Sequence, residues 1–128
     1  MATENDLAKI AVDISFRIHN SLGPGLLESV YEAAFALEFT KLNINFERQK
    51  GIGAFYEGIN LGLGFRADYI LENKLLIELK SVEHIEKVHH KTVLTYLKLA
   101  NLKLGLLINF NVEVIKDGIY RKIRGQLV

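Results

Sequence analysis

The sequence predicts a single α/β domain in which a mixed β-sheet is flanked by helices. Apolar residues recur at helical spacing near the start of the chain, strand-like segments follow, and another helical pattern precedes a last buried strand. The order helix, strands, helix, strand is typical of a sheet covered by helices. With 128 residues, of which 49% are apolar and 24% charged, the chain suits one compact domain spanning residues 1–128.

Two helices are expected before the strands. The first ends near Asn20 and has an apolar stripe made of Leu7, Ile10, Ala11, Ile14 and Ile18. The turn Gly23-Pro24-Gly25 separates it from a second helix, expected from about Leu26 to Leu42. The stripe of this second helix is formed by Leu27, Val30, Tyr31 and Ala34.

The remaining elements follow from alternation, turn residues and one further helical pattern. Strands are expected over Asn43 to Gln49 and Gly51 to Tyr56, with a turn at Glu57-Gly58 before the strands that carry Asp68 and Glu78. A helix is expected over Lys87 to Asn101, with a face formed by Val88, Thr92, Thr95 and Leu99. Then follow a buried strand (Leu104 to Phe110), a turn (Asp117-Gly118) and an edge strand (Ile119 to Ile123).

The segment FRADYILENKLLIELKSVE, residues 65–83, contains the most informative charges. A two-residue turn would place Asp68 and Glu78 on opposite faces, because a slip of one residue flips every side chain. A three-residue loop over residues 72–74 instead pairs Leu71 with Leu75 and places the two acids side by side. We favour this loop because Asn73 tolerates the left-handed conformation that it needs. Lys80 then lies one step further along the same face.

Acids and a lysine on a strand usually form a solvated face with cross-strand ion pairs. Here the opposite face, formed by Leu75, Ile77 and Leu79, is apolar, so the hairpin is expected to be buried on both sides. Buried carboxylates are costly unless they are paired or bind a metal. Two acids beside a lysine are also what metal-assisted phosphodiester hydrolysis requires.

Composition excludes several classes of protein. The chain has no cysteine, so it has neither a disulfide scaffold nor a thiolate metal site. The start lacks the regions of a signal peptide, and no apolar run approaches the ~20 residues that a membrane span needs, so a soluble, cytoplasmic protein is expected.

The charges are unevenly distributed along the chain. Residues 1–73 hold 6 Lys/Arg against 10 Asp/Glu, whereas residues 74–128 hold 10 against 5. A basic half beside an acidic pocket suits a phosphate backbone, although a solvated lysine-rich surface is the commoner explanation of such asymmetry.

The residues resemble a known family. Gly25-Leu26-Leu27-Glu28-Ser29-Val30-Tyr31 fits the pattern that names the GxxExxY proteins, small prokaryotic domains similar to the PD-(D/E)XK nuclease superfamily. The blocks that fit occur in the family's order over nearly the whole chain. They are residues 18–25, Phe46-Glu47-Arg48-Gln49, Phe65-Arg66-Ala67-Asp68, Ile77-Glu78-Leu79-Lys80, Tyr96-Leu97-Lys98-Leu99 and residues 105–110. The resemblance implies a restriction-endonuclease-like core of order α-β-β-β-α-β with an extra N-terminal helix.

The resemblance also implies roles. Asp68 and Glu78 would be metal-binding acids, Glu28 a third acid supplied by the preceding helix, and Lys80 the catalytic lysine. Carboxylate oxygens suit Mg²⁺ or Mn²⁺. Taken alone, Glu28 has another explanation, because acids are favoured in the first turn of a helix. The expected partner is nucleic acid, DNA or RNA, with Lys91 and Lys98 on its backbone and Tyr96 beside them; no membrane is expected.

One departure from the family's pattern favours a different class of function. The family carries glutamine at the position of Thr92, and threonine is shorter. The alternative to a magnesium-dependent nuclease is therefore an inactive nuclease-fold module that binds nucleic acid or a protein, including a second copy as a homodimer. His84, His89 and His90 lack the i, i+4 spacing of a helical zinc pair and are expected at the surface.

Overall fold

The computed structural model describes residues 1–127. Two helices precede three strands, and a third helix precedes the last two strands. The elements are α1 (Glu4–Leu22), α2 (Glu28–Lys41), β1 (Phe46–Tyr56), β2 (Ile59–Leu71), β3 (Leu75–Lys80), α3 (Lys87–Ala100), β4 (Leu104–Asn109), a short 3₁₀ helix η1 (Ile115–Gly118) and β5 (Ile119–Ile123). The predicted α/β class and element order, consistent with a restriction-endonuclease-like fold, are confirmed.

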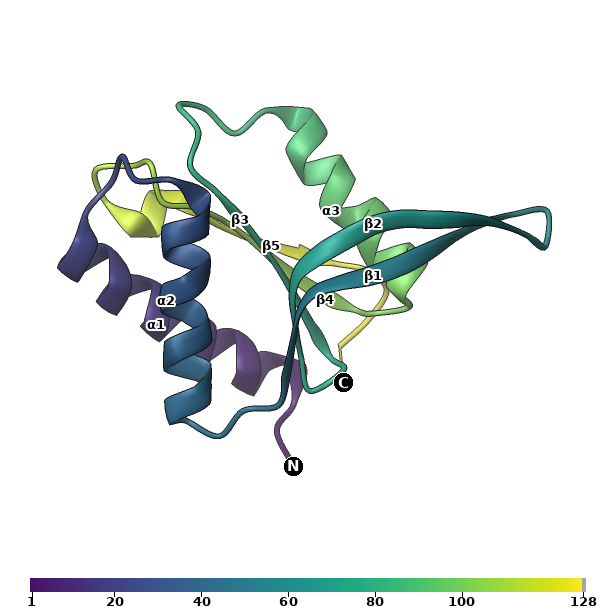
Figure 1. Ribbon diagram of the computed structural model, residues 1–128, viewed down its shortest axis with the longest axis horizontal. Helices are drawn as coiled ribbons and strands as arrows, with labels where there is room; N and C mark the ends of the chain where they lie inside the picture. The colour runs from purple at the N-terminus through teal and green to yellow at the C-terminus, as the bar shows by residue number, and fades with distance from the viewer. Residues whose placement is uncertain (128) are drawn as a thin grey trace.

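The five strands form one mixed sheet of order β1-β2-β3-β4-β5. All neighbours pair antiparallel except β3 and β4, which are parallel and are joined through α3. A parallel pair needs such a crossover connection, and a helix is its usual form. Figure 1 shows α1 and α2 on one side of the sheet and α3 on the other. Each residue of β3 therefore faces one of two helical layers.

The loop between β2 and β3 has the predicted length and register. Leu71 pairs with Leu75, Ile70 with Leu76, and Tyr69 with Ile77. The sequence predicted one left-handed residue, whereas both Glu72 (φ 51°) and Asn73 (φ 56°) adopt this conformation. The even-numbered residues of β3 consequently face α3 with Ile70, and the odd-numbered residues face α1 and α2.

Two hydrophobic clusters cover the two faces of the sheet. The larger lies under α1 and α2 and includes Tyr31, Phe35, Phe39, Tyr69, Ile77 and Phe110. The smaller lies under α3 and includes Phe65, Ile70, Leu76, Val93, Leu97 and Leu107. The side chains of β3 from Leu75 to Glu78 are buried on both faces, as the apolar pattern predicted.

The predicted face of α3 was wrong, and that of α2 was right only for Tyr31 and Ala34. In α2 the buried residues are Tyr31, Phe35 and Phe39, while Leu27 is 74% exposed. In α3 the buried residues are Val93 and Leu97, and Val88 is exposed. Apolar residues occur around most of α2, so the periodicity alone did not identify the side that packs against the sheet.

The predicted pair of strands from Asn43 to Tyr56 is one long strand, β1, which begins only at Phe46. Gln49 interrupts its alternation because its φ is 52°, in the left-handed region. Beyond this residue, β1 and β2 continue as a hairpin that projects from the body of the domain (Figure 1). We call residues 51–64 the arm. No helix within residues 1–127 is both long and apolar enough to cross a membrane.

Candidate active site

Asp68 and Glu78 meet where β2 and β3 diverge. The pairing of β2 with β3 is regular up to Tyr69 and Ile77. Beyond this pair, backbone N–H groups of the two strands donate to the carboxylates of Asp68 and Glu78. The Asp68 N–H donates to Glu78 Oε2 at 3.2 Å, and the Leu79 N–H donates to Asp68 Oδ2 at 2.8 Å. Each acid is thus bound to the backbone of the opposite strand, and the Glu78 side chain faces α3.

Burial gives this acid pair unusual electrostatics. Glu78 is only 7% exposed, and burial, followed by the charge of nearby Asp68 and a hydrogen bond with it, raises the Glu78 pKa to about 9. Lys80 acts in the opposite direction, but its effect is smaller. At neutral pH Glu78 therefore keeps its proton unless another positive charge lies beside the pair.

Lys80 lies on the same side of β3 and lines a small cavity together with Glu78. This cavity has a volume of about 30 Å³, enough for a water molecule, and α3 supplies its opposite wall through His89, Thr92, Val93 and Tyr96. The Tyr96 ring stacks on Phe65 with a centroid distance of 3.8 Å. Tyr96 and Glu78 line the same cavity, and burial, followed by the charges of Glu78 and Asp68, raises the Tyr96 pKa.

His89 has a fixed orientation in this wall. The Glu86 N–H donates to His89 Nδ1 at 2.8 Å, and the Glu86 side chain in turn caps the backbone of His89 at the start of α3. Since Nδ1 accepts, a neutral ring carries its proton on Nε2. The expectation of surface histidines is confirmed for His84, which is exposed, whereas His89 and His90 are half-buried and His90 packs edge-on against Tyr120.

A second polar network reaches Asp68 from the opposite side. The Gln49 side-chain amide donates to Asp68 Oδ1 at 3.0 Å and to Glu32 Oε1 at 2.6 Å, while Arg48 donates to Glu32 Oε2 at 2.7 Å. Glu32 belongs to α2, and its backbone carbonyl accepts a hydrogen bond from the Tyr69 hydroxyl. Gln49 thereby links the second helix to the acid pair, and its left-handed backbone turns its side chain toward them.

Glu28 occupies a different place. It is exposed in the first turn of α2 and lines a surface depression with Gly25, Leu26, Leu27, Ser81 and Asn111. Within residues 1–127, no group of three or more acids or histidines is arranged to hold a metal ion. The structure thus brings Asp68 and Glu78 together, with Lys80 beside Glu78, and does not gather Glu28 with them. The role of Glu28 as a third ligand stays a prediction.

The remaining motif residues build the loop before α2. The Tyr31 hydroxyl donates to the Gly23 carbonyl at 2.6 Å and accepts from the Leu26 N–H at 3.1 Å, and the Tyr31 ring stacks on Phe110. Gly23 (φ 75°) and Gly25 (φ 95°) have backbone conformations that other residues rarely adopt. Tyr31, the tyrosine of the pattern, thus holds both ends of the loop from Gly23 to Leu26, and Gly25, the glycine of the pattern, lies within this loop.

Sequence reasoning missed Gln49, Glu32 and His89 as parts of the site. Gln49 stands in the block Phe46-Glu47-Arg48-Gln49, which the resemblance includes but to which it gave no role. His89 follows Glu86 by three residues, the spacing of reciprocal N-terminal capping. Neither signal indicates that Gln49 bonds to Asp68 or that His89 lines the cavity with Glu78. Both arrangements depend on how distant elements pack.

A sheet with diverging central strands, two opposed carboxylates and a lysine two residues after the second acid fits a nuclease-like domain. The family model described as the PD-(D/E)XK nuclease superfamily matches residues 5–122, and the chain belongs to this superfamily. The searches of curated proteins and of solved structures gave no match.

Proposed function

We propose that the domain is a divalent-metal-dependent nuclease that hydrolyses phosphodiester bonds in DNA or RNA. The observation that supports this most is the mutual bonding of Asp68 and Glu78 at the divergence of β2 and β3, with Lys80 next along the same face. Membership of the nuclease superfamily supports the same reaction class. The closer assignment to the GxxExxY proteins and a cytoplasmic location are part of this proposal.

The acid pair fits a hard divalent cation such as Mg²⁺ or Mn²⁺. Both ligands are carboxylates, and the buried Glu78 would ionise readily only beside a positive charge. Asp68 and Glu78 would hold the ion, with Glu28 as the predicted third acid. Such an ion supplies Lewis acidity that polarises a phosphate and lowers the pKa of a bound water.

The other residues of the cavity have distinct roles in this proposal. Lys80 donates to the phosphate or to the attacking water and stabilises the negative charge that develops during reaction. His89 presents its Nε2–H as a second donor, because its Nδ1 is occupied by the Glu86 N–H. Lys91 and Lys98 are exposed on α3, seven residues apart and therefore on similar sides of the helix, and contact the phosphate backbone. Tyr96, on the same helix, also contacts the nucleic acid in this proposal.

Thr92 supports a second candidate, a nuclease-fold module without turnover that binds nucleic acid or a protein. Thr92 lines the cavity with Glu78 and Lys80, at the position where relatives are expected to carry glutamine. Its shorter side chain leaves one fewer group to hold substrate there. Both candidates use the same surface, and they differ in whether phosphodiester bonds are cut.

The deciding experiment incubates the full chain with single- and double-stranded DNA and RNA in Mn²⁺, in Mg²⁺ and in EDTA. The nuclease proposal expects metal-dependent cleavage that Glu78→Ala abolishes. Glu83→Ala is the matched control, because Glu83 is also an acid near the end of β3 but its side chain is 89% exposed. Metal-independent cleavage that is equal in wild type and Glu78→Ala would reveal a contaminating nuclease and remove support for the proposal. Absence of cleavage, with nucleic-acid binding retained, would favour the module.

A further inference from the structure

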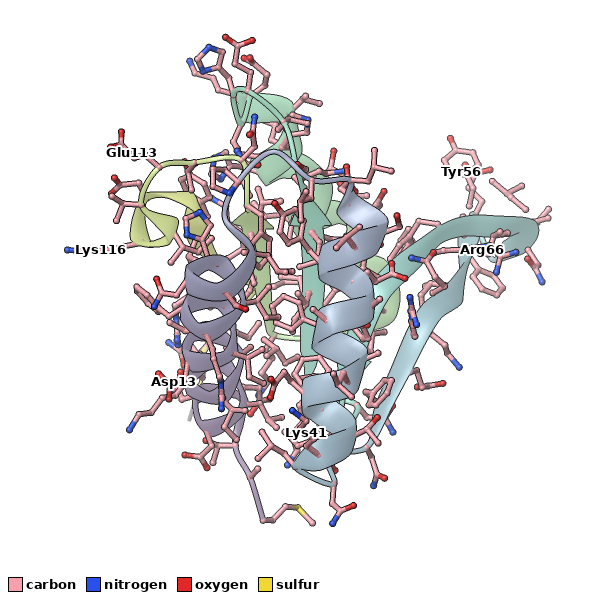
Figure 2. All side chains as sticks on the ribbon, turned by 60° about the vertical axis from the view of Figure 1, so that its left-hand side comes forward. Asp13, Lys41, Tyr56, Arg66, Glu113 and Lys116 are labelled. Atoms are coloured by element: carbon pink, nitrogen blue, oxygen red, sulfur yellow. The ribbon has the colours of Figure 1, made fainter. Side chains whose placement is uncertain are left out.

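The arm has an unusual surface. Residues 51–64 include seven apolar residues and five glycines, and their only charge is Glu57. Five of its side chains are 58–66% exposed, namely Phe55, Tyr56, Ile59, Leu61 and Leu63. In Figure 2 the labelled Tyr56 side chain projects outward from the arm. A contiguous exposed apolar surface of this kind is a typical sign of an interaction site.

The edges of the arm are also unprotected. Within residues 1–127, β1 pairs only with β2, and β3 pairs with β2 only from Tyr69 to Leu71. Along the arm both strands therefore have one free edge. Natural proteins usually protect such edges with lysine, proline, inward-pointing charges or β-bulges. The arm has no lysine or proline, its single charge lies at the tip, and the register shifts between Ile52 and Phe55 interrupt only part of β1. Most of its edges and faces are therefore suited to being covered by a partner.

Charge argues against nucleic acid as the partner of the arm. A phosphate backbone is bound mainly through lysine and arginine, and residues 51–64 contain neither. The nearest cation after the arm is Arg66, at its base. Arg66 and Glu57 make no ion pair within the described residues. The arm thus has an unpaired acid at its tip and an unpaired base at its root.

A second copy of the chain matches all these features. In a two-fold arrangement with antiparallel arms, the tip of each arm lies against the root of the other, so that Glu57 approaches Arg66 of the other copy. A large side chain has roughly 150–250 Å² of surface to bury. Since the five arm side chains are each 58–66% exposed, together they offer roughly 500–600 Å² per copy. Two copies would bury about 1,000–1,200 Å² in total, near the lower limit of specific interfaces.

We propose that the arm is a homodimerisation element, in which the apolar surfaces of two arms pack together and Glu57 of each copy pairs with Arg66 of the other. The small area predicts a concentration-dependent dimer. This proposal does not depend on whether the domain cleaves nucleic acid.

Sedimentation equilibrium of the full chain, from about 5 to about 300 µM, tests the proposal. The mass is expected to rise from 14.5 kDa toward twice this value. Leu61→Glu and Tyr56→Glu should each raise the dimer Kd at least about tenfold, because they bury a charge in an apolar contact. Leu37→Glu is the matched control, since Leu37 is 59% exposed but lies on α2. Neither Tyr56 nor Leu61 belongs to the core clusters, so both variants should keep the wild-type thermal unfolding.

A charge exchange tests the geometry. Glu57→Arg should weaken the dimer, and combining it with Arg66→Glu should restore it toward the wild-type Kd. A wild type that remains monomeric at every concentration would overturn the proposal, as would a dimer that Leu37→Glu disrupts and Leu61→Glu does not. A monomer whose binding to a labelled single-stranded oligonucleotide is weakened by Leu61→Glu would instead assign the arm to nucleic acid.

Discussion

Asp68 accepts a hydrogen bond from the backbone of the strand that carries Glu78, and Glu78 accepts one from the backbone N–H of Asp68. Neither acid can leave its position without removing a backbone partner from the other strand. The pair is consequently held together before any ion binds, although burial and the charge of Asp68 disfavour the ionised form of Glu78.

The stability of the metal-free domain is expected to fall as the pH rises from about 5 to about 9. The Glu78 pKa is about 9 in the folded chain, above its ordinary value of 4.5, so between these values the folded state binds a proton that the unfolded state has lost. The free energy of unfolding, measured by urea titration in EDTA, should decrease by a few kcal/mol across this window. Glu78→Gln should remove most of this decrease and Glu83→Gln should not. An identical pH profile for wild type and Glu78→Gln would contradict the assignment.

Addition of Mg²⁺ or Mn²⁺ should raise the melting temperature and release protons. An ion held by Asp68 and Glu78 needs both carboxylates ionised, so binding near pH 7 should displace close to one proton from Glu78. Calorimetry in buffers of different ionisation enthalpy measures this proton directly. Asp68→Asn should abolish both effects. If Asp68→Asn bound the ion as tightly as wild type, the site would lie elsewhere.

Lys80→Ala should reduce turnover much more than nucleic-acid binding. Lys80 lies beside Glu78 in the cavity, where it is expected to act on the reacting phosphate. Losing one such donor typically lowers kcat by about 10²–10³-fold. Single-turnover kinetics and equilibrium binding, compared with Lys74→Ala at the opposite end of β3, separate the two quantities. A loss confined to Kd would make Lys80 a binding residue.

His89→Ala should slow cleavage by roughly tenfold, since one oriented donor is removed from the cavity wall. His84→Ala, at an exposed position before α3, should have no effect. His89→Asn tests whether a donor suffices without the imidazole. Because His89 also caps α3, thermal unfolding of each variant shows whether any loss of rate arises from the fold. Equal cleavage rates for His89→Ala and wild type would remove His89 from the mechanism.

Removing Lys91 or Lys98 should weaken nucleic-acid binding and reduce the slope of log Kd against log salt concentration by about one phosphate contact each. Both side chains are exposed on α3. Lys9→Ala is the matched control, because Lys9 is exposed on α1, on the other side of the sheet. Fluorescence anisotropy at several salt concentrations measures the slopes. An unchanged slope in both variants would place the nucleic acid on a different surface.

The sequence predicts the acid pair better than the residues around it, for a physical reason. The relation of Asp68 to Glu78 depends on strand parity and on the length of one loop, and both are local. The contact from Gln49 to Glu32 depends on a left-handed residue within β1 and on how α2 packs against the sheet. The presence of His89 in the same cavity wall as Lys80 likewise depends on where α3 docks. Periodicity identified Tyr31 and Ala34 but not Phe35 and Phe39 in α2, and it failed to choose the buried side of α3, because both helices have apolar residues on more than one side.

The crossover through α3 separates two stages in the assembly of the site. Asp68 and Glu78 are ten residues apart and meet within a hairpin, so little chain entropy is lost in bringing them together. The wall formed by Thr92 and Tyr96 arrives only when β4 pairs in parallel with β3, a contact between residues about 29 positions apart. The acids can therefore meet while water still surrounds them. The cost of ionising both acids becomes large only at the last step of folding, when α3 closes over them and Glu78 takes up a proton.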